Sequence, residues 1–127
     1  MAKELLYKDL TYKIRGVLFK VHNELGPVHK EKVYQRAVAK ELKNQELVFE
    51  REKRISVFYD NEAVGTYVPD FIIDDKVILE IKAVPCLNKQ MQDQVWYYIR
   101  STKYRLVLLA NFGTPSLEVK RRIYDHP

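Results

Sequence analysis

The sequence has very little cysteine: Cys86 is the only one among 127 residues. A single cysteine excludes an internal disulfide and a zinc site built from several cysteines, and it fits a protein of the reducing cytoplasm. Long apolar runs are also missing, since no stretch approaches the roughly 20 residues of a membrane-spanning helix. The charged start, residues 1–4 (MAKE), does not resemble a signal peptide. We therefore expect a cytoplasmic protein that makes no membrane contact.

Internal repeats, linkers and low-complexity segments are absent as well, and the length is that of one domain, residues 1–127. With 46% apolar and 31% charged residues, the composition is that of an ordinary globular protein rather than a disordered or fibrous one. The formal net charge is +5, and the isoelectric point is near 9.2. This positive charge favours an anionic partner such as nucleic acid.

Three stretches show the spacing of apolar residues that is typical of amphipathic helices. The first covers about residues 10–25 and is followed by Gly26-Pro27, where glycine suits a left-handed C-terminal position and proline cannot continue the helix. The second covers about residues 30–43. The third runs to about residue 101 and has Asn88 as its expected N-cap.

Short runs of β-branched and aromatic residues between and after these helices predict strands. They cover residues 47–52, 55–59 and 66–68, then the two central strands at residues 68–71 and 77–82, and finally residues 106–110. The last run is apolar throughout, which is typical of a strand that is buried on both faces and paired in parallel. The order of elements predicts an α/β fold with a mixed central β-sheet flanked by helices. A short polar tail with Lys120, Arg121 and Arg122 is expected to close the chain.

Three charged residues stand inside two of the apolar strands: Asp70, Glu80 and Lys82. Ionised groups in strand interiors are costly to bury unless they are paired, hydrated or bound to a metal. Glu80 and Lys82 are two residues apart, so on a strand they point to one face, while Ile81 points to the other. This arrangement predicts a metal site beside a catalytic cation. The alternative is a structural salt bridge between Lys82 and either carboxylate.

A metal site at these residues places a demand on the hairpin that joins the two strands. If Asp70 lies directly opposite Glu80, paired residue numbers sum to 150, and the closing pair is Ile73 with Val77 around a three-residue loop. A two-residue loop at residues 74–75 would give a sum of 149 and, without a bulge, would put the carboxylates on opposite faces. The register of this hairpin therefore decides whether the two carboxylates can share a metal.

The PD of residues 69–70, followed by EIK at residues 80–82, resembles the signature of the PD-(D/E)XK nuclease superfamily. Five further stretches are similar, in order and spacing, to the GxxExxY family, a group of small bacterial and archaeal proteins within that superfamily. They are residues 21–26 (VHNELG), residues 31–35 (EKVYQ), Gln94 with Tyr98, residues 109–113 (LANFG) and residues 119–122 (VKRR). The resemblance covers about residues 10–123 and implies the PD-(D/E)XK, restriction-endonuclease-like core. At residues 28–30 (VHK) the family usually has a second glycine and an apolar pair, so the loop before Glu31 is expected to differ in shape.

The resemblance implies a divalent cation, Mg²⁺ or Mn²⁺, held by the carboxylates of Asp70 and Glu80 and by the backbone carbonyl of Ile81. These are hard oxygen ligands, and no set of Cys and His residues is present to recruit zinc. Lys82 is expected to orient the attacking water or to stabilise charge that develops on the phosphate. Glu31 is expected to be an additional ligand, directly or through a water. The alternative for Glu31 is an exposed residue that interacts with the helix dipole.

Gln94 and Tyr98 are one helical turn apart, so both can face the same edge of the sheet. Similar nucleases use such a pair to orient the catalytic lysine or to touch the substrate backbone. The alternative for Tyr98 is a place in the core, and one tyrosine can also do both. His22 and His29 have no other His or Cys at a metal-ligating spacing, so structural roles are expected for them.

Together these features predict a metal-dependent nuclease that cleaves phosphodiester bonds of nucleic acid. DNA rather than RNA is the expected substrate. Two alternatives keep the same fold. One is a nucleic-acid-binding module without useful turnover, and the other is a structural or protein-interaction domain in which D…ExK is a remnant salt bridge. A domain of this size has little room for a specificity element, so help from a homodimer or a partner protein is also expected.

Overall fold

The computed structural model of the protein describes residues 6–127. Its elements are α1 (Lys8–Leu25), α2 (Glu31–Asn44), β1 (Phe49–Arg51), β2 (Ile55–Tyr59), β3 (Glu62–Tyr67), β4 (Phe71–Ile73), β5 (Val77–Lys82), α3 (Lys89–Arg100), β6 (Leu106–Asn111) and β7 (Glu118–Ile123). The charged residues 1–4, at the start of the expected domain, lie outside the described range. Within that range no helix combines the length and the apolarity that crossing a membrane requires.

The three predicted helices are confirmed, and local chemistry explains where they begin and end. Helix α1 ends at Gly26, which has a positive φ of 69° and donates its N–H to the His22 carbonyl. Positive φ costs glycine little, and Pro27 then prevents a further helical turn. At the start of α3, the Asn88 side chain accepts a hydrogen bond from the Met91 N–H, as expected for an N-cap.

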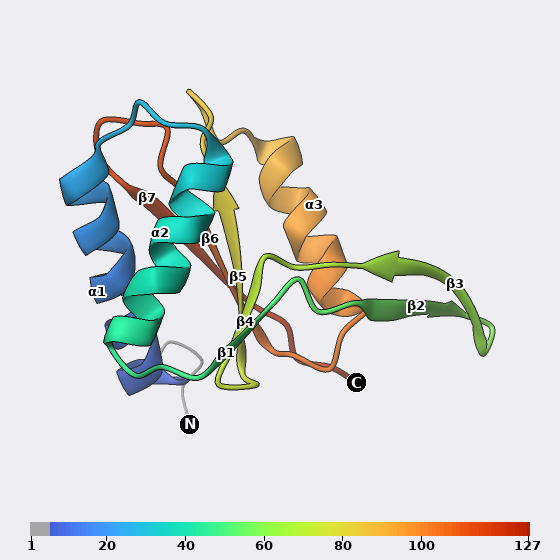
Figure 1. The fold of residues 1–127 in the computed structure, drawn as a ribbon. Coiled ribbons are helices and arrows are strands. Elements are labelled where there is room, and N and C mark those ends of the chain that lie inside the picture. Colours follow the sequence, from blue (N-terminus) through green and yellow to red (C-terminus); the bar gives the residue numbers. More distant parts are fainter. Residues whose placement is uncertain (1–5) are drawn as a thin grey trace.

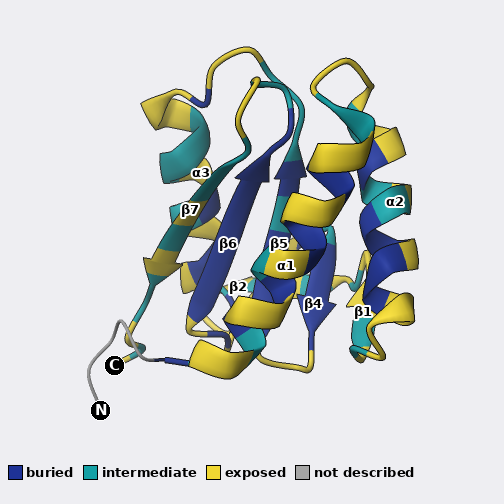
Figure 2. Ribbon diagram, turned by 90° about the vertical axis from the view of Figure 1, so that its left-hand side faces the viewer, coloured by how far each residue is buried: buried dark blue, intermediate teal, exposed yellow. Residues whose placement is uncertain are grey.

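Five strands form one mixed sheet in the order β1-β4-β5-β6-β7. Strands β5 and β6 run parallel, and the other neighbours run antiparallel. Helix α3 connects the two parallel strands, which cannot be joined by a tight turn. Helices α1 and α2 cover one face of the sheet and α3 covers the other (Figure 1). The predicted mixed α/β sheet is therefore confirmed, and β6 is buried along its whole length (Figure 2).

Alternate residues of β5 belong to two different cores. The odd-numbered residues of this strand pack with α1 and α2 and are at most 1% exposed. Ile78 belongs to the smaller core under α3. Because side chains of a strand alternate between its faces, Glu80 and Lys82 point to the α3 side. The charged residues thus leave the larger core entirely apolar.

The hairpin between β4 and β5 has the register that a shared metal requires. Ile73 pairs with Val77, and paired residue numbers sum to 150 throughout, around a loop at residues 74–76. Both aspartates of this loop have positive φ, 53° and 50°, a conformation that aspartate tolerates better than most residues do. Extended by one more pair, the same register sets Asp70 opposite Glu80.

The end of the chain differs from the expectation. The basic segment that was expected as a polar tail forms β7, which pairs antiparallel with β6 at the edge of the sheet. Val119 and Ile123 pack against the larger core, while Lys120 and Arg122 are exposed. Charged residues are common on edge strands because they discourage pairing with other chains, and here they obscured the alternating pattern of the strand.

Strands β2 and β3 form a separate two-stranded hairpin beside the main sheet, and it projects away from the body of the molecule (Figure 1). Asp60 and Asn61 make its turn with positive φ values of 50° and 64°, which is the geometry of a tight hairpin turn. Tyr59 and Val64 near its tip are 75% and 57% exposed. A strand pattern does not show which sheet a strand joins, so the sequence did not distinguish this hairpin from the main sheet.

Candidate active site

Asp70 and Glu80 lie together at the open end of the β4–β5 hairpin, where the chain enters β4 and β5 nears its end. The Asp70 N–H donates a hydrogen bond to Oε1 of Glu80 over 2.8 Å. The Ile81 N–H donates to Oδ2 of Asp70 over 2.7 Å. Since β4 begins only at Phe71, the Asp70 carboxylate takes the place of a backbone acceptor for Ile81. The two carboxylates are thus held side by side through backbone groups.

These two carboxylates are partly buried and repel each other. Burial raises the pKa of Glu80 to about 8, and the nearby charge of Asp70 contributes to the rise. Burial also raises the pKa of Asp70, although the Ile81 N–H and the Lys82 ammonium act in the opposite direction. Negative charge is therefore under-compensated here, a condition that a bound cation relieves. The hard oxygen donors fit Mg²⁺ or Mn²⁺ better than they fit zinc.

The carbonyl of Ile81 faces the same side as the carboxylates. Within a strand, the N–H and C=O of one residue point to one neighbouring strand, and those of the next residue point to the other. The Ile81 N–H reaches Asp70 on the β4 side, whereas the Lys82 carbonyl accepts from the Phe112 N–H on the β6 side over 2.8 Å. The Ile81 carbonyl is thus directed to the β4 side of the strand, where the two carboxylates lie.

Lys82 follows Glu80 by two residues and is half-buried on the same face of β5. Against the upward effect of burial, its charge lowers the pKa of Glu80, Asp70 and Glu31, so the ammonium lies within electrostatic reach of all three. Within residues 6–127, no salt bridge joins Lys82 to a carboxylate. The remnant salt bridge of the structural alternative is therefore not formed in this arrangement.

Helix α2 brings two more side chains to the site, from the opposite face of the sheet. Burial raises the pKa of Glu31, the first residue of the helix; Lys82 lowers it and Asp70 raises it further. Gln35 donates its side-chain N–H to Oδ1 of Asp70 over 3.3 Å. Sequence reasoning missed Gln35 as a site residue. The available signal was its position four residues after Glu31, on the same face of the helix.

The acidic side chains are not gathered into a complete metal cage. Among residues 6–127, no three or more His, Cys, Asp or Glu side chains lie together in a way that could hold a metal ion. Glu31 is half-buried, and its pKa responds to the charges of Lys82 and Asp70, so it differs from an exposed helix residue.

On the α3 side, a pocket of about 270 Å³ opens beside the charged end of β5. Its lining residues are Thr66, Tyr67, Val68, Glu80, Lys82, Gln94, Val95 and Tyr98. The structure thus brings Gln94 and Tyr98 to the same pocket as Glu80 and Lys82. Tyr98 is 37% exposed and does not belong to the buried core under α3.

Tyr67, the last residue of β3, is a pocket residue that sequence reasoning missed. Its ring stacks on that of Tyr98, with centroids 4.4 Å apart and planes 4° from parallel. Tyr67 is 4% exposed, and within residues 6–127 its hydroxyl is the only fully buried side-chain polar group without a hydrogen-bond partner. An aromatic residue at the end of a strand ordinarily indicates packing, so the sequence pattern carried no signal for an unpaired hydroxyl.

The unpaired hydroxyl of Tyr67 is costly to the fold. Burying a polar group without a hydrogen bond costs about 1–3 kcal/mol. Burial raises the pKa of this phenol, and the charges of Glu80 and Asp70 raise it further, so the hydroxyl stays protonated and can donate. A protonated donor is therefore held close to the two acidic residues of the site.

The chain that leaves the site after Lys82 is fixed by the end of β6. Oδ1 of the fully buried Asn111 accepts hydrogen bonds from the N–H groups of Val84 and Gly113, over 3.0 and 3.1 Å. Its Nδ2 donates to the Val84 carbonyl and to Oε1 of Glu118, both over 3.0 Å. A Cβ at Gly113 would collide with the backbone of Val84, so this close approach requires glycine.

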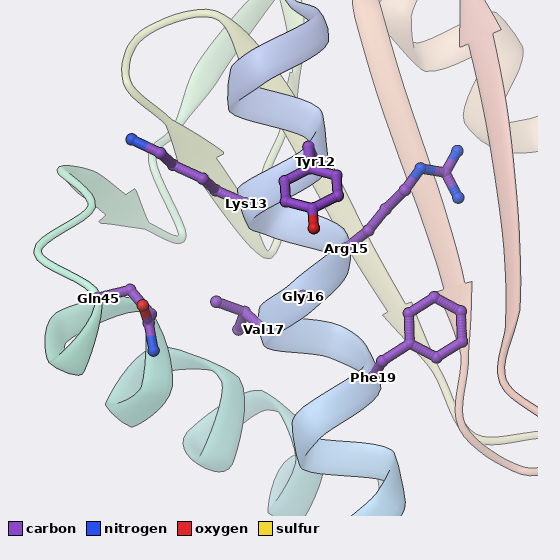
Figure 3. Close-up of a pocket in the computed structure, with 7 residues that line it drawn as sticks. All are labelled: Tyr12, Lys13, Arg15, Gly16, Val17, Phe19 and Gln45. Atoms are coloured by element: carbon purple, nitrogen blue, oxygen red, sulfur yellow. The ribbon is translucent and has the colours of Figure 1, made fainter.

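Other candidate features lie apart from these carboxylates. A larger hollow of about 510 Å³ lies on the outer side of α1 (Figure 3) and is lined by Tyr12, Lys13, Arg15, Gly16, Val17, Phe19 and Gln45. Its lining contains no acidic residue that could bind a cation. His22 is buried, and its Nε2 pairs with the Thr114 carbonyl over 2.9 Å, which is a structural role. His29 uses its backbone N–H to bind the Tyr34 hydroxyl.

Comparison with known proteins identifies the family. A family model described as the PD-(D/E)XK nuclease superfamily matches residues 8–122, which is most of the chain. The protein therefore belongs to the PD-(D/E)XK nuclease superfamily. The members of this superfamily are generally nucleases, and they typically use divalent metal ions. No curated protein and no solved structure gives a significant match.

Proposed function

We propose that this protein is a divalent-metal-dependent nuclease that hydrolyses phosphodiester bonds of nucleic acid, and that its substrate is DNA rather than RNA. One observation carries this proposal. The carboxylates of Asp70 and Glu80 are held side by side next to a lysine that does not neutralise them. Membership of the superfamily supports a nuclease over the structural alternative. The ordered motifs around Glu31 and the Gln94–Tyr98 pair support a place in the GxxExxY family within it.

The metal ligands in this proposal are the carboxylates of Asp70 and Glu80 and the carbonyl of Ile81. Mg²⁺ or Mn²⁺ suits these oxygens, and when bound it polarises the phosphodiester and lowers the pKa of a water molecule. Glu31 is an additional ligand, directly or through a water, and its electrostatic interactions with Asp70 and Lys82 support this role. Gln35 holds Asp70 from the α2 side and so fixes the orientation of that ligand.

The remaining polar residues act on the substrate. The Lys82 ammonium orients the attacking water or stabilises negative charge on the phosphate oxygens in the transition state. Gln94 and Tyr98 lie in the same pocket as Lys82 and touch the substrate backbone or position the lysine. The net charge of +5 supports attraction between the protein and a polyanion.

Location and assembly belong to the proposal as well. We place the protein in the cytoplasm, where a single exposed cysteine is kept reduced. We also propose that a homodimer or a partner protein supplies specificity, since the domain is small. Sedimentation as a strict monomer at high concentration would remove the homodimer from this proposal.

A second candidate is a nucleic-acid-binding module that turns over slowly or not at all. The carboxylate pair and the pocket beside it support this candidate too, because binding a metal and a nucleic acid does not by itself require turnover. This candidate keeps metal and nucleic-acid binding and differs from the first in turnover alone.

The deciding experiment is a cleavage assay on duplex DNA, single-stranded DNA, RNA and branched DNA with Mg²⁺, Mn²⁺ or EDTA. The wild type is compared with Glu80→Ala and with Asp9→Ala, which removes an exposed carboxylate in the first turn of α1, at the opposite end of the sheet from the site (Figure 2). Metal-dependent cleavage that is lost in Glu80→Ala and kept in Asp9→Ala supports the nuclease. Binding of metal and DNA without cleavage supports the second candidate. If wild type and Glu80→Ala are equally inactive and neither binds metal, both candidate functions are defeated.

A further inference from the structure

The Tyr67 hydroxyl has no partner within the described part of the fold. It makes no hydrogen bond to residues 6–127, although the side chain is only 4% exposed. A phenylalanine at this position would fill nearly the same space and keep the stack on Tyr98 without burying an unpaired polar atom. The hydroxyl therefore calls for a partner that comes from outside the fold.

The pocket around Tyr67 defines the chemistry of that partner. Side chains with hydrogen-bond donors surround it, namely Thr66, Lys82, Gln94 and Tyr98. The ammonium of Lys82 adds a positive charge, and this ammonium forms no salt bridge with any of the described residues. Several donors and one cation around a small polar pocket suit an anion with several acceptor oxygens, and a phosphate group has this character.

The position of the pocket beside the proposed metal ligands indicates that the phosphate belongs to the substrate. Glu80 lines the pocket, and its carboxylate is beside that of Asp70, so a phosphate in the pocket is next to the proposed metal ligands. Tyr67 lines this pocket together with Glu80, and the charges of Glu80 and Asp70 raise the pKa of its hydroxyl. A phosphodiester of the substrate, placed for hydrolysis, would present its oxygens to this hydroxyl.

Resting on the proposed nuclease function, we propose that Tyr67 is a substrate-binding residue whose hydroxyl donates a hydrogen bond to a non-bridging oxygen of the bound phosphodiester. The parallel contact with the Tyr98 ring holds the phenol in one orientation, so little freedom is lost when the substrate binds. Tyr67 comes from the hairpin formed by β2 and β3, whereas Gln94 and Tyr98 come from α3. The substrate phosphate is thus contacted from two separate elements.

The test compares Tyr67→Phe with wild type and with Tyr124→Phe, which removes a hydroxyl from another half-buried tyrosine on the α3 side. Affinity is measured for a fluorescein-labelled DNA oligonucleotide in Ca²⁺ as a substitute cation, with the DNA checked for cleavage. Tyr67→Phe is expected to bind roughly ten-fold more weakly, as the loss of one hydrogen bond to a charged group predicts. Its affinity for Mn²⁺ and its thermal stability should match or exceed those of wild type. Tyr124→Phe should bind DNA as wild type does.

Two results would overturn the role of Tyr67. One is unchanged DNA affinity in Tyr67→Phe, and the other is a clear loss of its thermal stability, which would show that the hydroxyl serves the fold. Wild type that binds DNA without cleaving it in Mg²⁺ or Mn²⁺ defeats the nuclease function, and the binding comparison still decides Tyr67. If wild type cleaves DNA and Tyr67→Phe has the same kcat and KM, the role of Tyr67 is wrong and the nuclease function stands. Wild type that neither binds nor cleaves defeats both.

Discussion

The two faces of strand β5 carry different kinds of side chain along one backbone. Toward α1 and α2, every odd-numbered residue of the strand is apolar and at most 1% exposed. Toward α3, the strand is apolar at Ile78 and then presents Glu80 and Lys82 to an open pocket. The first face belongs to the larger core along its whole length. The second face changes from core at Ile78 to the charged site at Glu80 and Lys82.

This difference shows how a charged site can be held on a buried strand. Charged groups that are partly withdrawn from water lower stability unless something compensates them. The apolar face supplies that compensation, since each fully buried Leu or Ile side chain contributes about 1.5–3 kcal/mol. Even-numbered residues near the end of β5 are thereby free to serve chemistry. Substitutions on the two faces should consequently separate stability from activity.

The largest effect is expected on the apolar face, from Leu79→Ala. This side chain is fully buried in the larger core, so its truncation should lower the free energy of unfolding by about 2–5 kcal/mol. Urea denaturation measures the loss. The fraction that remains folded should still bind Mn²⁺ with nearly the affinity of wild type, because the carboxylates lie on the other face. Mn²⁺ affinity that falls in step with stability would mean that the two faces are not separable.

The next effect is expected on the charged face, from Lys82→Met, which keeps an unbranched side chain of similar length and removes the charge. Loss of one group that stabilises transition-state charge should lower kcat by about 10²–10³-fold. Stability in urea should change little, because the ammonium makes no salt bridge within the described residues, and its lost attraction to the carboxylates is offset by the removal of a half-buried charge. Lys76→Ala, in the exposed loop of the same hairpin, is the matched control. A stability loss without an activity loss would contradict the assignment.

A smaller effect concerns the pH dependence of stability in the metal-free protein. The pKa of Glu80 is near its ordinary value of 4.5 when the chain is unfolded and about 8 when it is folded. Below both values the carboxyl is protonated in both states, and between them only the folded state keeps the proton. Stability should therefore fall as pH rises through this window, by roughly 3–4 kcal/mol between pH 5 and pH 8. Urea titrations in EDTA at about pH 5 and about pH 8 should show this fall in wild type and a shallower one in Glu80→Gln. Equal slopes in the two proteins would contradict it.

The smallest effect is expected at Gln35, which supports the site from the α2 side. Its side chain makes one hydrogen bond of 3.3 Å to Asp70, so Gln35→Ala should weaken Mn²⁺ binding by about three- to ten-fold. Calorimetric titration measures this change. Arg36→Ala, the exposed neighbour on α2, should bind Mn²⁺ as wild type does. An unchanged affinity in Gln35→Ala would show that Asp70 is oriented by the Ile81 N–H alone.

The helices could be predicted, since Gly26-Pro27 and Asn88 give local stop and start signals. These features are decided by residues close together in the sequence. The register of the β4–β5 hairpin was not decided by the sequence, which allowed a loop of two residues at 74–75 or of three residues at 74–76. The structure has the three-residue loop, the choice that keeps Asp70 and Glu80 on one face.

The features that sequence reasoning missed depend on contacts between distant segments. Gln35 belongs to the site because α2 lies next to the start of β4, and Tyr67 because its hydroxyl finds no partner after packing is complete. The edge strand β7 was missed because an edge tolerates charge where a central strand does not. Alternation along one segment contains no information about which neighbour a segment will find.

The contacts of Asn111 fix the segment that follows Lys82 when the protein folds, before any substrate binds. Its side chain saturates the backbone polar groups of Val84, and Gly113 lies too close to that backbone for any side chain. The segment that follows Lys82 is thus immobilised during folding, and its conformational entropy is lost at that stage rather than on substrate binding. Substrate binding then requires no further ordering of this segment, so this part of the site is in place before a substrate arrives.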